Sequence, residues 1–336
     1  MNPLLLPLSF VLALALALYF TPVARVAALR FGIVDRPSTP LKQQREPVPY
    51  LGGLAVFLAF VIALGLVLEF DRVLLGILLA ATLTLLVGLI DDFGVLTPFG
   101  KLLGQGVAVF VLLRSGAVIE LIDVPEGLRW PLAALWLLAV CNAFNIIDIL
   151  DGLAAGVGAL AALSLGIIAV ATRQFALAAL ALSLAGALVG FVVFNLAPAK
   201  IYLGDAGALT VGITLGALAL ALPMTERSEA GFLAPLTLLL VPLADTAYVT
   251  VLRARAGKPF WHGSPDHFPL RLRRALSGDV RRTVLLCWGL SLAGCVAGVA
   301  AVVSFPWQWG LVGMGAVVGV QLVVLLVLAR RPMESR

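Results

Sequence analysis

The sequence predicts an all-α membrane protein, a polytopic bundle of ten or eleven transmembrane helices that forms one domain over residues 1–336. The composition is one reason, because 62% of the residues are hydrophobic and only 12% are charged, whereas a soluble domain carries about 25% charged residues. The pattern is the other, because apolar stretches of about 20 residues, long enough to cross a bilayer as a helix, recur along the whole chain.

The apolar stretches are centred near residues 13, 60, 80, 110, 138, 162, 185, 214, 241, 293 and 318. The first, from about Leu4 to Phe20, has neither a basic segment before it nor a cleavage-site pattern, which favours a retained helix over a signal peptide. Only Glu69, Asp71 and Arg72 separate the second stretch from the third. The longest polar stretches, residues 25–48 and 253–282, are predicted loops.

The basic residues predict an orientation. The net charge of +5 suits loops that rest on anionic lipid headgroups and gives no reason to expect nucleic-acid binding. With eleven spans, 18 of the 23 lysines and arginines lie in odd-numbered loops or at the C-terminus, and the exceptions are Arg72, Arg114, Arg129, Arg173 and Arg227. The positive-inside rule then predicts an extracytoplasmic N-terminus in the inner (cytoplasmic) membrane, with cytoplasmic loops near residues 25–48, 91–100, 148–152, 196–206 and 253–282.

Three short polar segments, residues 89–94, 142–152 and 202–207, interrupt the apolar stretches, and the predicted orientation places all three at the cytoplasmic face. Together they carry five carboxylates, those of Asp91, Asp92, Asp148, Asp151 and Asp205. Carboxylates without histidine or cysteine beside them favour a hard cation such as Mg²⁺, which commonly takes its other ligands from water and substrate phosphates. The pattern therefore predicts a metal and phosphate site at one membrane surface.

The second polar segment predicts a polar stripe. Asn142, Asn145, Asp148 and Asp151 are spaced three residues apart, so they share one face if the fifth span continues as a helix. Since a carboxylate facing hydrocarbon is costly, this face should point into the bundle or a wet cleft. The alternative is a helix that simply ends in solvated polar residues.

The other acids allow two interpretations each. Asp91 and Asp92 point about 100° apart on a helix, which suggests different roles, although a solvated helix end is equally consistent with the pair. Asp205 lies among Gly204 and Gly207, residues small enough to let a ligand approach the backbone, but it could instead only cap the eighth helix. Asp245 lies inside the ninth span and is either a site residue or a structural hydrogen-bond acceptor.

These segments resemble the polyprenyl-phosphate N-acetylhexosamine-1-phosphate transferase superfamily, which belongs to glycosyltransferase family 4. The resemblance runs from about residue 35 to residue 272, and its branch is that of the bacterial undecaprenyl-phosphate GlcNAc-1-phosphate transferases. It rests on Pro47-Val-Pro-Tyr-Leu-Gly-Gly53, on Gly88-Leu-Ile-Asp-Asp-Phe-Gly94 with Lys101-Leu-Leu-Gly-Gln105, on Asn145-x-x-Asp148-x-x-Asp151-Gly-Leu, on Gly204-Asp205-x-Gly207, and on Lys258-Pro-Phe followed by His267-Phe-x-x-Arg271-Leu.

The resemblance implies a helical bundle with a cytoplasmic active site. It implies transfer of N-acetylhexosamine-1-phosphate, with GlcNAc-1-phosphate as the first choice, from a UDP-sugar to a polyprenyl phosphate such as undecaprenyl phosphate. UMP would be released, and the reaction would be the first membrane step of cell-envelope polysaccharide assembly. Mg²⁺ is the implied cofactor, with Mn²⁺ as a substitute, and a homodimer is compatible with this assignment.

The resemblance also implies roles for individual residues. Asp205 is the first choice for a metal ligand, with Asp92 and Asp148 beside it, and one of Asp91 and Asp92 is a candidate base. The catalytic candidates are Asp91, Asp92, Asp148, Asp151 and His267, and the substrate-binding candidates are Lys42, Lys101, Asn145, Arg271, Gly204 and Asp245.

The loop near residue 267 departs from the family pattern. Many members carry clustered histidines there, whereas this chain has Pro269 and Leu270, and Gln44 stands where another histidine is common. This argues against the alternative of phospho-N-acetylmuramoyl-pentapeptide transfer. A short helix starting near Asp266 would tolerate Pro269 in its first turn, and His267 and Arg271 would then converge on one anionic group, while His262 would remain solvated.

A secondary transporter is a more distant alternative. Transporters also place acids inside helical bundles, but near the middle of the bilayer. The acids of this chain lie mainly at predicted helix ends, which favours an enzyme over a transporter.

Overall fold

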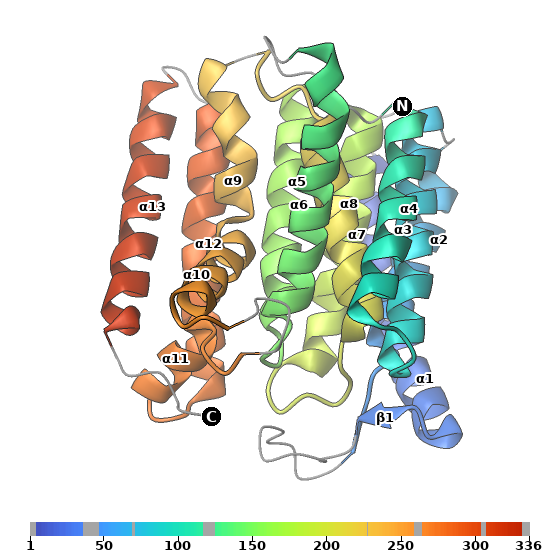
Figure 1. The fold of residues 1–336 in the computed structure, drawn as a ribbon. Helices are drawn as coiled ribbons and strands as arrows, with labels where there is room; N and C mark the ends of the chain where they lie inside the picture. The colour runs from blue at the N-terminus through green and yellow to red at the C-terminus, as the bar shows by residue number, and fades with distance from the viewer. Residues whose placement is uncertain are drawn as a thin grey trace.

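The computed structural model describes residues 5–35, 47–68, 71–116, 125–226, 228–258, 264–303 and 307–330. These residues form a bundle in which most of the long helices run in one direction (Figure 1), and the predicted all-α membrane fold is confirmed. The strands in the described residues are β1 (Val34–Asp35) and β2 (Val48–Pro49), which pair antiparallel beside the lower end of α1 (Leu5–Phe31) in the figure.

All eleven predicted centres lie within a helix. The helices are α1 (Leu5–Phe31), α2 (Gly52–Val67), α3 (Arg72–Asp92), α4 (Pro98–Ser115), α5 (Glu126–Ile147), α6 (Leu153–Ala171), α7 (Phe175–Asn195), α8 (Gly204–Ala221), the 3-10 helix η1 (Glu229–Leu233), α9 (Ala234–Leu238), α10 (Leu240–Arg255), α11 (Phe268–Ala275), α12 (Val280–Val303) and α13 (Gln308–Ala329). In the described ranges, 8 helices are long and apolar enough to cross a membrane, or 9 with the bent pair η1–α9 and α10. The two remaining predicted spans correspond to α2, which has 16 residues, and α4, which carries Lys101 and Arg114.

The ninth predicted span is not one straight helix. The η1–α9 segment and α10 meet at Leu239 with a bend of 70°. Pro242 explains where the chain can restart, because its missing N–H is tolerated in the first turn of α10 but would break a hydrogen bond inside a continuous helix. The expectation of a single continuous span was wrong here for this reason.

Several predicted loops are shorter than expected. Helix α1 continues to Phe31, so Arg25 and Arg30 lie on a helix and not in the loop predicted for residues 25–48. Asp91 and Asp92 are the last residues of α3, and the next helix begins at Pro98. The loop predicted for residues 253–282 contains the short helix α11.

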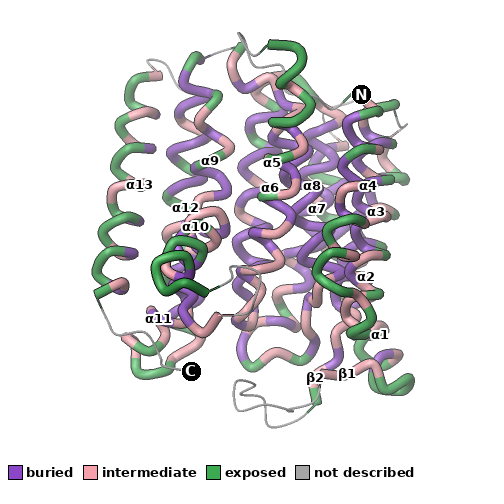
Figure 2. Tube along the Cα trace, in the orientation of Figure 1, coloured by how far each residue is buried: buried purple, intermediate pink, exposed green. Residues whose placement is uncertain are grey.

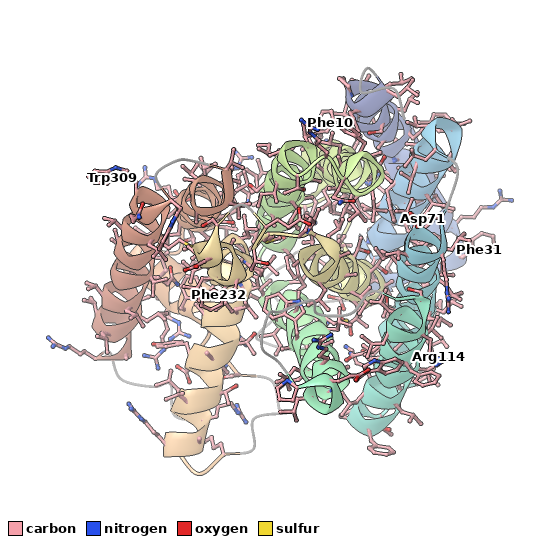
Figure 3. The ribbon with its side chains drawn as sticks, turned by 90° about the horizontal axis from the view of Figure 1, so that it is seen from above. Phe10, Phe31, Asp71, Arg114, Phe232 and Trp309 are labelled. Atoms are coloured by element: carbon pink, nitrogen blue, oxygen red, sulfur yellow. The ribbon has the colours of Figure 1, made fainter. Side chains whose placement is uncertain are left out.

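The most buried helices are α6, α7 and α8, which lie in the interior of the bundle, whereas the outward faces of α1 and α13 are exposed (Figure 2). Viewed from above, Trp309 near α13 and Arg114 near the end of α4 mark opposite edges of the bundle (Figure 3). The exposed positions on α13 are largely apolar, such as Leu326 and Val327. An apolar exterior around small and polar interior residues is the arrangement expected for a bundle in lipid.

Candidate active site

Four polar side chains from four helices meet at one end of the bundle. The ammonium of Lys101 donates to Oδ2 of Asp91 at 2.7 Å, to Oδ2 of Asp205 at 2.6 Å and to Oδ1 of Asn145 at 2.8 Å. Asn145 in turn donates from Nδ2 to Oδ1 of Asp205 at 2.7 Å. The structure therefore brings together candidates from all three polar segments, as the predicted common face required.

Asp92 has a different role from its neighbour. Its Oδ1 accepts a hydrogen bond from the backbone N–H of Asp205 at 2.8 Å, and its Oδ2 accepts one from the N–H of Ala206 at 3.2 Å. Asp92 thus caps the first turn of α8 from the end of α3. Asp91 and Asp92 therefore have different partners, as expected from their different directions, and the alternative that Asp205 caps α8 is wrong, since its side chain bonds to Lys101 and Asn145.

The small residues around Asp205 serve helix packing. A methyl group on Gly53 would lie 2.2 Å from the backbone nitrogen of Gly207, and one on Gly88 would lie 2.3 Å from the Cα of Ala206. Helices α2 and α3 therefore approach the start of α8 at backbone distance. The expectation that small residues here leave space for a ligand needs correction, because neighbouring helices fill that space.

The segment from Pro47 to Gly53 holds the loop that precedes α8. The N–H groups of Gly52 and Gly53 donate to the carbonyls of Tyr202 and Leu203 at 3.1 and 2.9 Å, and Tyr202 N–H donates to Pro49 O at 2.8 Å. The otherwise unsatisfied amides at the start of α2 are thereby used to fix the loop that leads into the site.

The predicted polar stripe is helical only in its first half. Asn142 and Asn145 lie on α5, which ends at Ile147, and the chain then turns to start α6 at Leu153. Asn142 exchanges hydrogen bonds with Gln105, donating from Nδ2 to Oε1 at 2.7 Å and accepting from Nε2 at 3.3 Å. Asn142 therefore joins α4 to α5 one helical turn away from Asn145 and the cluster that surrounds Lys101, which we call the lysine-centred cluster.

Asp148 and Asp151 lie in the turn between α5 and α6, and Gly152 closes this turn with a φ of +82°, which glycine adopts without strain. Asp151 Oδ2 accepts a hydrogen bond from Ala199 N–H at 2.9 Å. The carboxylate of Asp148 forms no hydrogen bond with any residue that the structure describes. Burial, followed by the negative charges of Asp205, Asp92 and Asp151, raises the pKa of Asp148 to about 8.

Asn195 is a positioning residue that sequence reasoning missed. Its buried side chain accepts from Gly152 N–H at 3.0 Å and donates to Ile201 O at 2.9 Å, joining the Asp148–Asp151 turn to the loop before α8. Trp288 Nε1 also donates to Gly152 O at 3.2 Å. The available signal was an amide at the end of the seventh apolar stretch, where a polar side chain needs a partner.

The candidates His267 and Asp245 contact each other. His267 Nδ1 lies 2.7 Å from Asp245 Oδ2, and Asp245 Oδ1 accepts from the N–H of Phe268 at 2.8 Å. Asp245 is fully buried and thus links α10 to the start of α11. Of its two predicted roles, the structure shows the structural hydrogen bonds.

Arg271 is buried and bonded within the protein. Its Nε and one terminal nitrogen donate to Asp266 Oδ1 at 3.1 and 2.6 Å, and its other terminal nitrogen donates to Leu328 O at 2.9 Å. The predicted short helix with Pro269 in its first turn is confirmed as α11. The expected convergence of His267 and Arg271 on one anionic group needs correction, because each contacts a different carboxylate of the protein.

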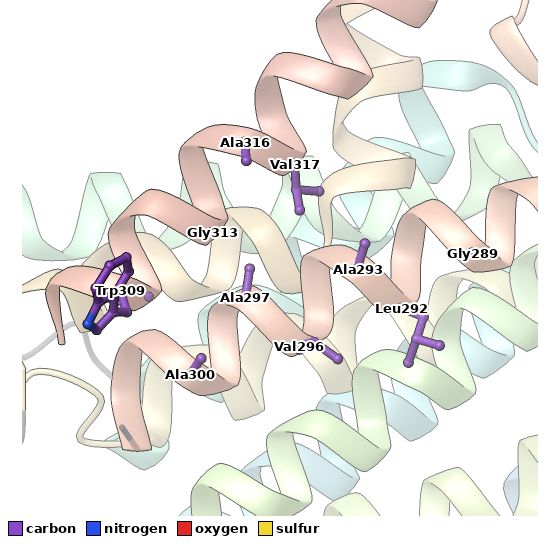
Figure 4. A pocket seen from close by; sticks show the side chains of 11 residues that line it. Gly289, Leu292, Ala293, Val296, Ala297, Ala300, Trp309, Gly313, Ala316 and Val317 are labelled. Carbon is purple, nitrogen blue, oxygen red and sulfur yellow. The ribbon is translucent and has the colours of Figure 1, made fainter. Parts of the chain in front are cut away.

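The candidate Lys42 lies outside the described residues, as do His262 and Gln44. A groove of about 530 Å³ between α12 and α13 is lined by apolar and small residues, among them Ala297, Trp309 and Gly313 (Figure 4). None of the lining residues carries a carboxylate, hydroxyl or ammonium group. The groove is therefore separate from the cluster of candidate catalytic groups.

The donor atoms of the cluster suit Mg²⁺ in kind. The carboxylate and amide oxygens of Asp91, Asp205, Asn145 and Asp148 are hard ligands. Among the described residues, no three acidic, histidine or cysteine side chains lie in a ready metal-binding group, and Lys101 neutralises Asp91 and Asp205. A cation here would thus need one or two carboxylates, with water and substrate phosphates completing its ligands, which is common for Mg²⁺.

Comparison with known proteins decides the family. A decaprenyl-phosphate N-acetylglucosaminephosphotransferase of Mycolicibacterium smegmatis is 32% identical over 94% of this chain and 87% of its own length. The chain belongs to glycosyl transferase family 4. The glycosyl transferase family 4 model itself matches residues 74–223, a range that includes all five candidate carboxylates of the polar segments.

Other relatives of this family 4 protein carry two kinds of name. A probable undecaprenyl-phosphate N-acetylglucosaminyl 1-phosphate transferase of Bacillus subtilis is 29% identical over 88% of this chain and 84% of its own length. A phospho-N-acetylmuramoyl-pentapeptide-transferase of a Synechococcus species is 33% identical over 88% of each chain. Overall identity therefore does not separate these two activities, and individual residues must do so.

Proposed function

We propose that this family 4 transferase moves GlcNAc-1-phosphate from UDP-GlcNAc to a polyprenyl phosphate such as undecaprenyl phosphate and releases UMP. This would be the first membrane step in the assembly of a cell-envelope polysaccharide. The arrangement around Lys101 carries the proposal, because it gathers one ammonium, two carboxylates and one amide where four helices meet at one end of the bundle. The relatives named for the same reaction support it.

The reaction needs little covalent chemistry from the protein. An oxygen of the lipid phosphate attacks the sugar-proximal phosphorus of the UDP-sugar, a new P–O bond forms, and the bond to the UMP oxygen breaks with its electron pair leaving on UMP. The second pKa of a phosphate monoester is about 6, so the acceptor is largely dianionic near neutral pH. A general base is therefore helpful and not obligatory, and orientation with charge compensation supplies most of the catalysis.

The residues of the cluster divide this work. Lys101 neutralises phosphate charge from its place between α3, α5 and α8, and Asp91 holds that ammonium in position. Asn145 orients Asp205 through the hydrogen bond from Nδ2. Asp148 and Asp151 lie in the adjoining turn, on the side where we place the nucleotide and the cation.

Asp205, with Asn145 and Asp148, would hold Mg²⁺ or Mn²⁺. A bound divalent cation would neutralise the charge that develops between the attacking and leaving oxygens. The absence of thiolates and imidazoles from the lysine-centred cluster favours these hard cations over zinc.

The charge distribution supports an active site on the cytoplasmic face of the inner membrane. Lys101 and Arg271, like most basic residues of the chain, lie in or next to the odd-numbered loops of the eleven-span prediction. The positive-inside rule places these loops on the cytoplasmic side. The UDP-sugar is a cytosolic type of donor, so the proposed substrate and orientation agree. Acids at helix ends also argue against a transporter, whose site would lie near the middle of the bilayer.

The test is a scan of UDP-sugars with purified protein, undecaprenyl phosphate and Mg²⁺ that follows UMP release and lipid product together. UDP-GlcNAc should give both products, excess EDTA should remove them, and Asp205→Asn should lower turnover by roughly 100-fold or more, because the amide lacks the charge that a hard cation needs. Preferred use of UDP-N-acetylmuramoyl-pentapeptide would replace the proposed sugar. Full turnover in EDTA would reject the metal site.

A further inference from the structure

The first turn of α8 has no cap of its own. Leu203 stands at the N-cap position and has no side-chain hydrogen bond to the helix. The first N–H groups of a helix have no partner within it, so they need an acceptor from elsewhere. Asp92 supplies two carboxylate oxygens from the end of α3, one to Asp205 N–H and one to Ala206 N–H.

The backbone of α8 is adapted to this contact. Gly204 has a φ of +72°, and a methyl group there would lie 2.8 Å from Asp92 Oδ2 and 3.1 Å from Oδ1. A side chain at this position would therefore meet both a strained backbone and the capping carboxylate. Gly88, one turn before Asp92, brings the two helices to backbone distance in the same region.

The capped turn carries the functional side chain. Asp205 itself donates the shorter of the two hydrogen bonds to Asp92, while its own carboxylate contacts Lys101 and Asn145. Both oxygens of Asp92 are used by backbone amides, whereas its neighbour Asp91 contacts the lysine ammonium. The two adjacent acids thus reach different parts of the same cluster.

We propose that Asp92 is a positioning residue that acts through the backbone of α8, holding Asp205 where it binds the cation, and that Asp92 is neither a cation ligand nor the base. This inference rests on the proposed function for the identity of the cation site. It makes a specific claim about chemistry: position 92 requires a hydrogen-bond acceptor of the right length, and the full negative charge is secondary.

The test compares Asp92→Asn, Asp92→Ser and Asp92→Ala. Asparagine keeps an acceptor oxygen at the same reach as aspartate, serine carries one that is a bond shorter, and alanine has none, so a capping role predicts that Asn retains most of what Ala loses and that Ser lies between them. Mn²⁺ affinity, measured by electron paramagnetic resonance without substrate, should fall at least about tenfold in Asp92→Ala and less than about threefold in Asp92→Asn. Thermal stability in EDTA should follow the same order, with Asp92→Ala the least stable.

A ligand or base role predicts the opposite pattern. Asp92→Asn would then lose Mn²⁺ affinity or turnover as severely as Asp92→Ala, and both would be as stable as the parent in EDTA or more stable, since one repelling carboxylate is gone. That result would overturn the proposal. The serine and asparagine variants keep the test decisive if Asp92→Ala does not fold.

Asp71 provides the matched control. It caps α3 at the other end of the same helix, accepting from Leu74 N–H at 2.7 Å, about 30 Å from Asp92 along the axis. Asp71→Ala should lower thermal stability and leave Mn²⁺ affinity unchanged, so loss of a cap alone does not mimic the effect. Metal affinity and stability are measured without substrate. The capping role of Asp92 can therefore be rejected while the proposed sugar-phosphate transfer holds, and the transfer can be rejected while the capping role holds.

Discussion

The ammonium nitrogen of Lys101 lies 2.6 Å from Oδ2 of Asp205, although the two residues are 104 positions apart in the sequence. The same nitrogen lies 2.7 Å from Oδ2 of Asp91, so one cation compensates two carboxylates. The Lys101 side chain is 15% exposed, so water solvates and screens these charges only in part. Lys101 thus fixes the ends of α3 and α8 relative to α4.

Replacing Lys101 with methionine should destabilise the metal-free protein. The substitution keeps the chain length but leaves Asp91 and Asp205 without their shared cation, at a cost of about 1–3 kcal/mol. Mg²⁺ should then raise the melting temperature more in Lys101→Met than in the parent, because a divalent cation would compensate the same carboxylates. Thermal denaturation in detergent with Mg²⁺ and with EDTA measures both effects.

Lys200→Met is the control, since Lys200 is exposed in the loop before α8 and its loss should leave both melting temperatures unchanged. Equal stability of Lys101→Met and the parent in EDTA would mean that the two carboxylates do not depend on this lysine.

The pKa of Asp148 predicts how the stability of the metal-free protein varies with pH. Burial and the neighbouring acids raise this pKa to about 8, whereas an unfolded aspartate titrates near about 3.9. Between these values the folded state holds a proton that the unfolded state has lost, so this group makes stability fall as pH rises and has no further effect above about pH 8.

Asp148→Asn should remove that contribution. The variant should lose less stability than the parent between pH 5 and 8, measured in EDTA by thermal or denaturant unfolding. Identical pH dependence of the two proteins would show that Asp148 titrates normally. Since a hard cation needs the ionised form, Mn²⁺ affinity of the parent should also rise with pH over this range.

The sequence predicted the site at the level of helix ends. The positions of Asp91, Asn145 and Asp205 at the ends of apolar stretches, together with one loop parity, were sufficient to place them on a common face. Hydropathy reports where a span begins and ends, and the third, fifth and eighth spans each carry polar side chains at the end that the predicted orientation assigns to one face. The all-α bundle and the family followed from the same features.

The contacts between helices were beyond sequence reasoning. Nothing in the spacing of residues indicates that Asp92 meets the backbone of a helix more than 110 positions later, or that Gly53 packs against Gly207. Glycines next to a polar segment are consistent with ligand approach and with helix packing alike. The break at Leu239 was missed because Pro235 and Pro242, on either side of it, stand at positions where proline is also tolerated at the start of a helix.

The predicted orientation can be checked by cysteine labelling. Cysteine at Ser264, which precedes α11, should react with a membrane-impermeant reagent only from the cytoplasmic side, and cysteine at Glu126, at the start of α5, only from the opposite side. Helix α11 and the start of α5 lie toward opposite ends of the bundle (Figure 1). The native Cys141, Cys287 and Cys295 are buried and should remain unlabelled. Labelling of both introduced cysteines from one side would contradict the loop parity.

The last prediction concerns His267 and Arg271. His267→Ala should raise KM for the UDP-sugar and lower kcat, because this histidine stands at the start of α11 and its ring, held by Asp245 of α10, fixes that segment. His262→Ala should change little, and a severe defect there with a silent His267→Ala would mean that the loop was assigned wrongly. Arg271 is expected to act differently, through the stability of the fold.

Arg271→Ala should be strongly destabilising, since it leaves Asp266 buried without its partner, a loss of about 3–5 kcal/mol. Its activity alone would therefore be uninformative, but the double variant Asp266→Leu, Arg271→Met separates the two possibilities, because removing both partners of a buried ion pair is often nearly neutral. We expect the double variant to recover most of the melting temperature and a KM for UDP-GlcNAc close to that of the parent, since the guanidinium is occupied by Asp266 and by the Leu328 carbonyl. If the double variant recovers its stability but has a KM for UDP-GlcNAc well above that of the parent, Arg271 contacts the donor directly during turnover.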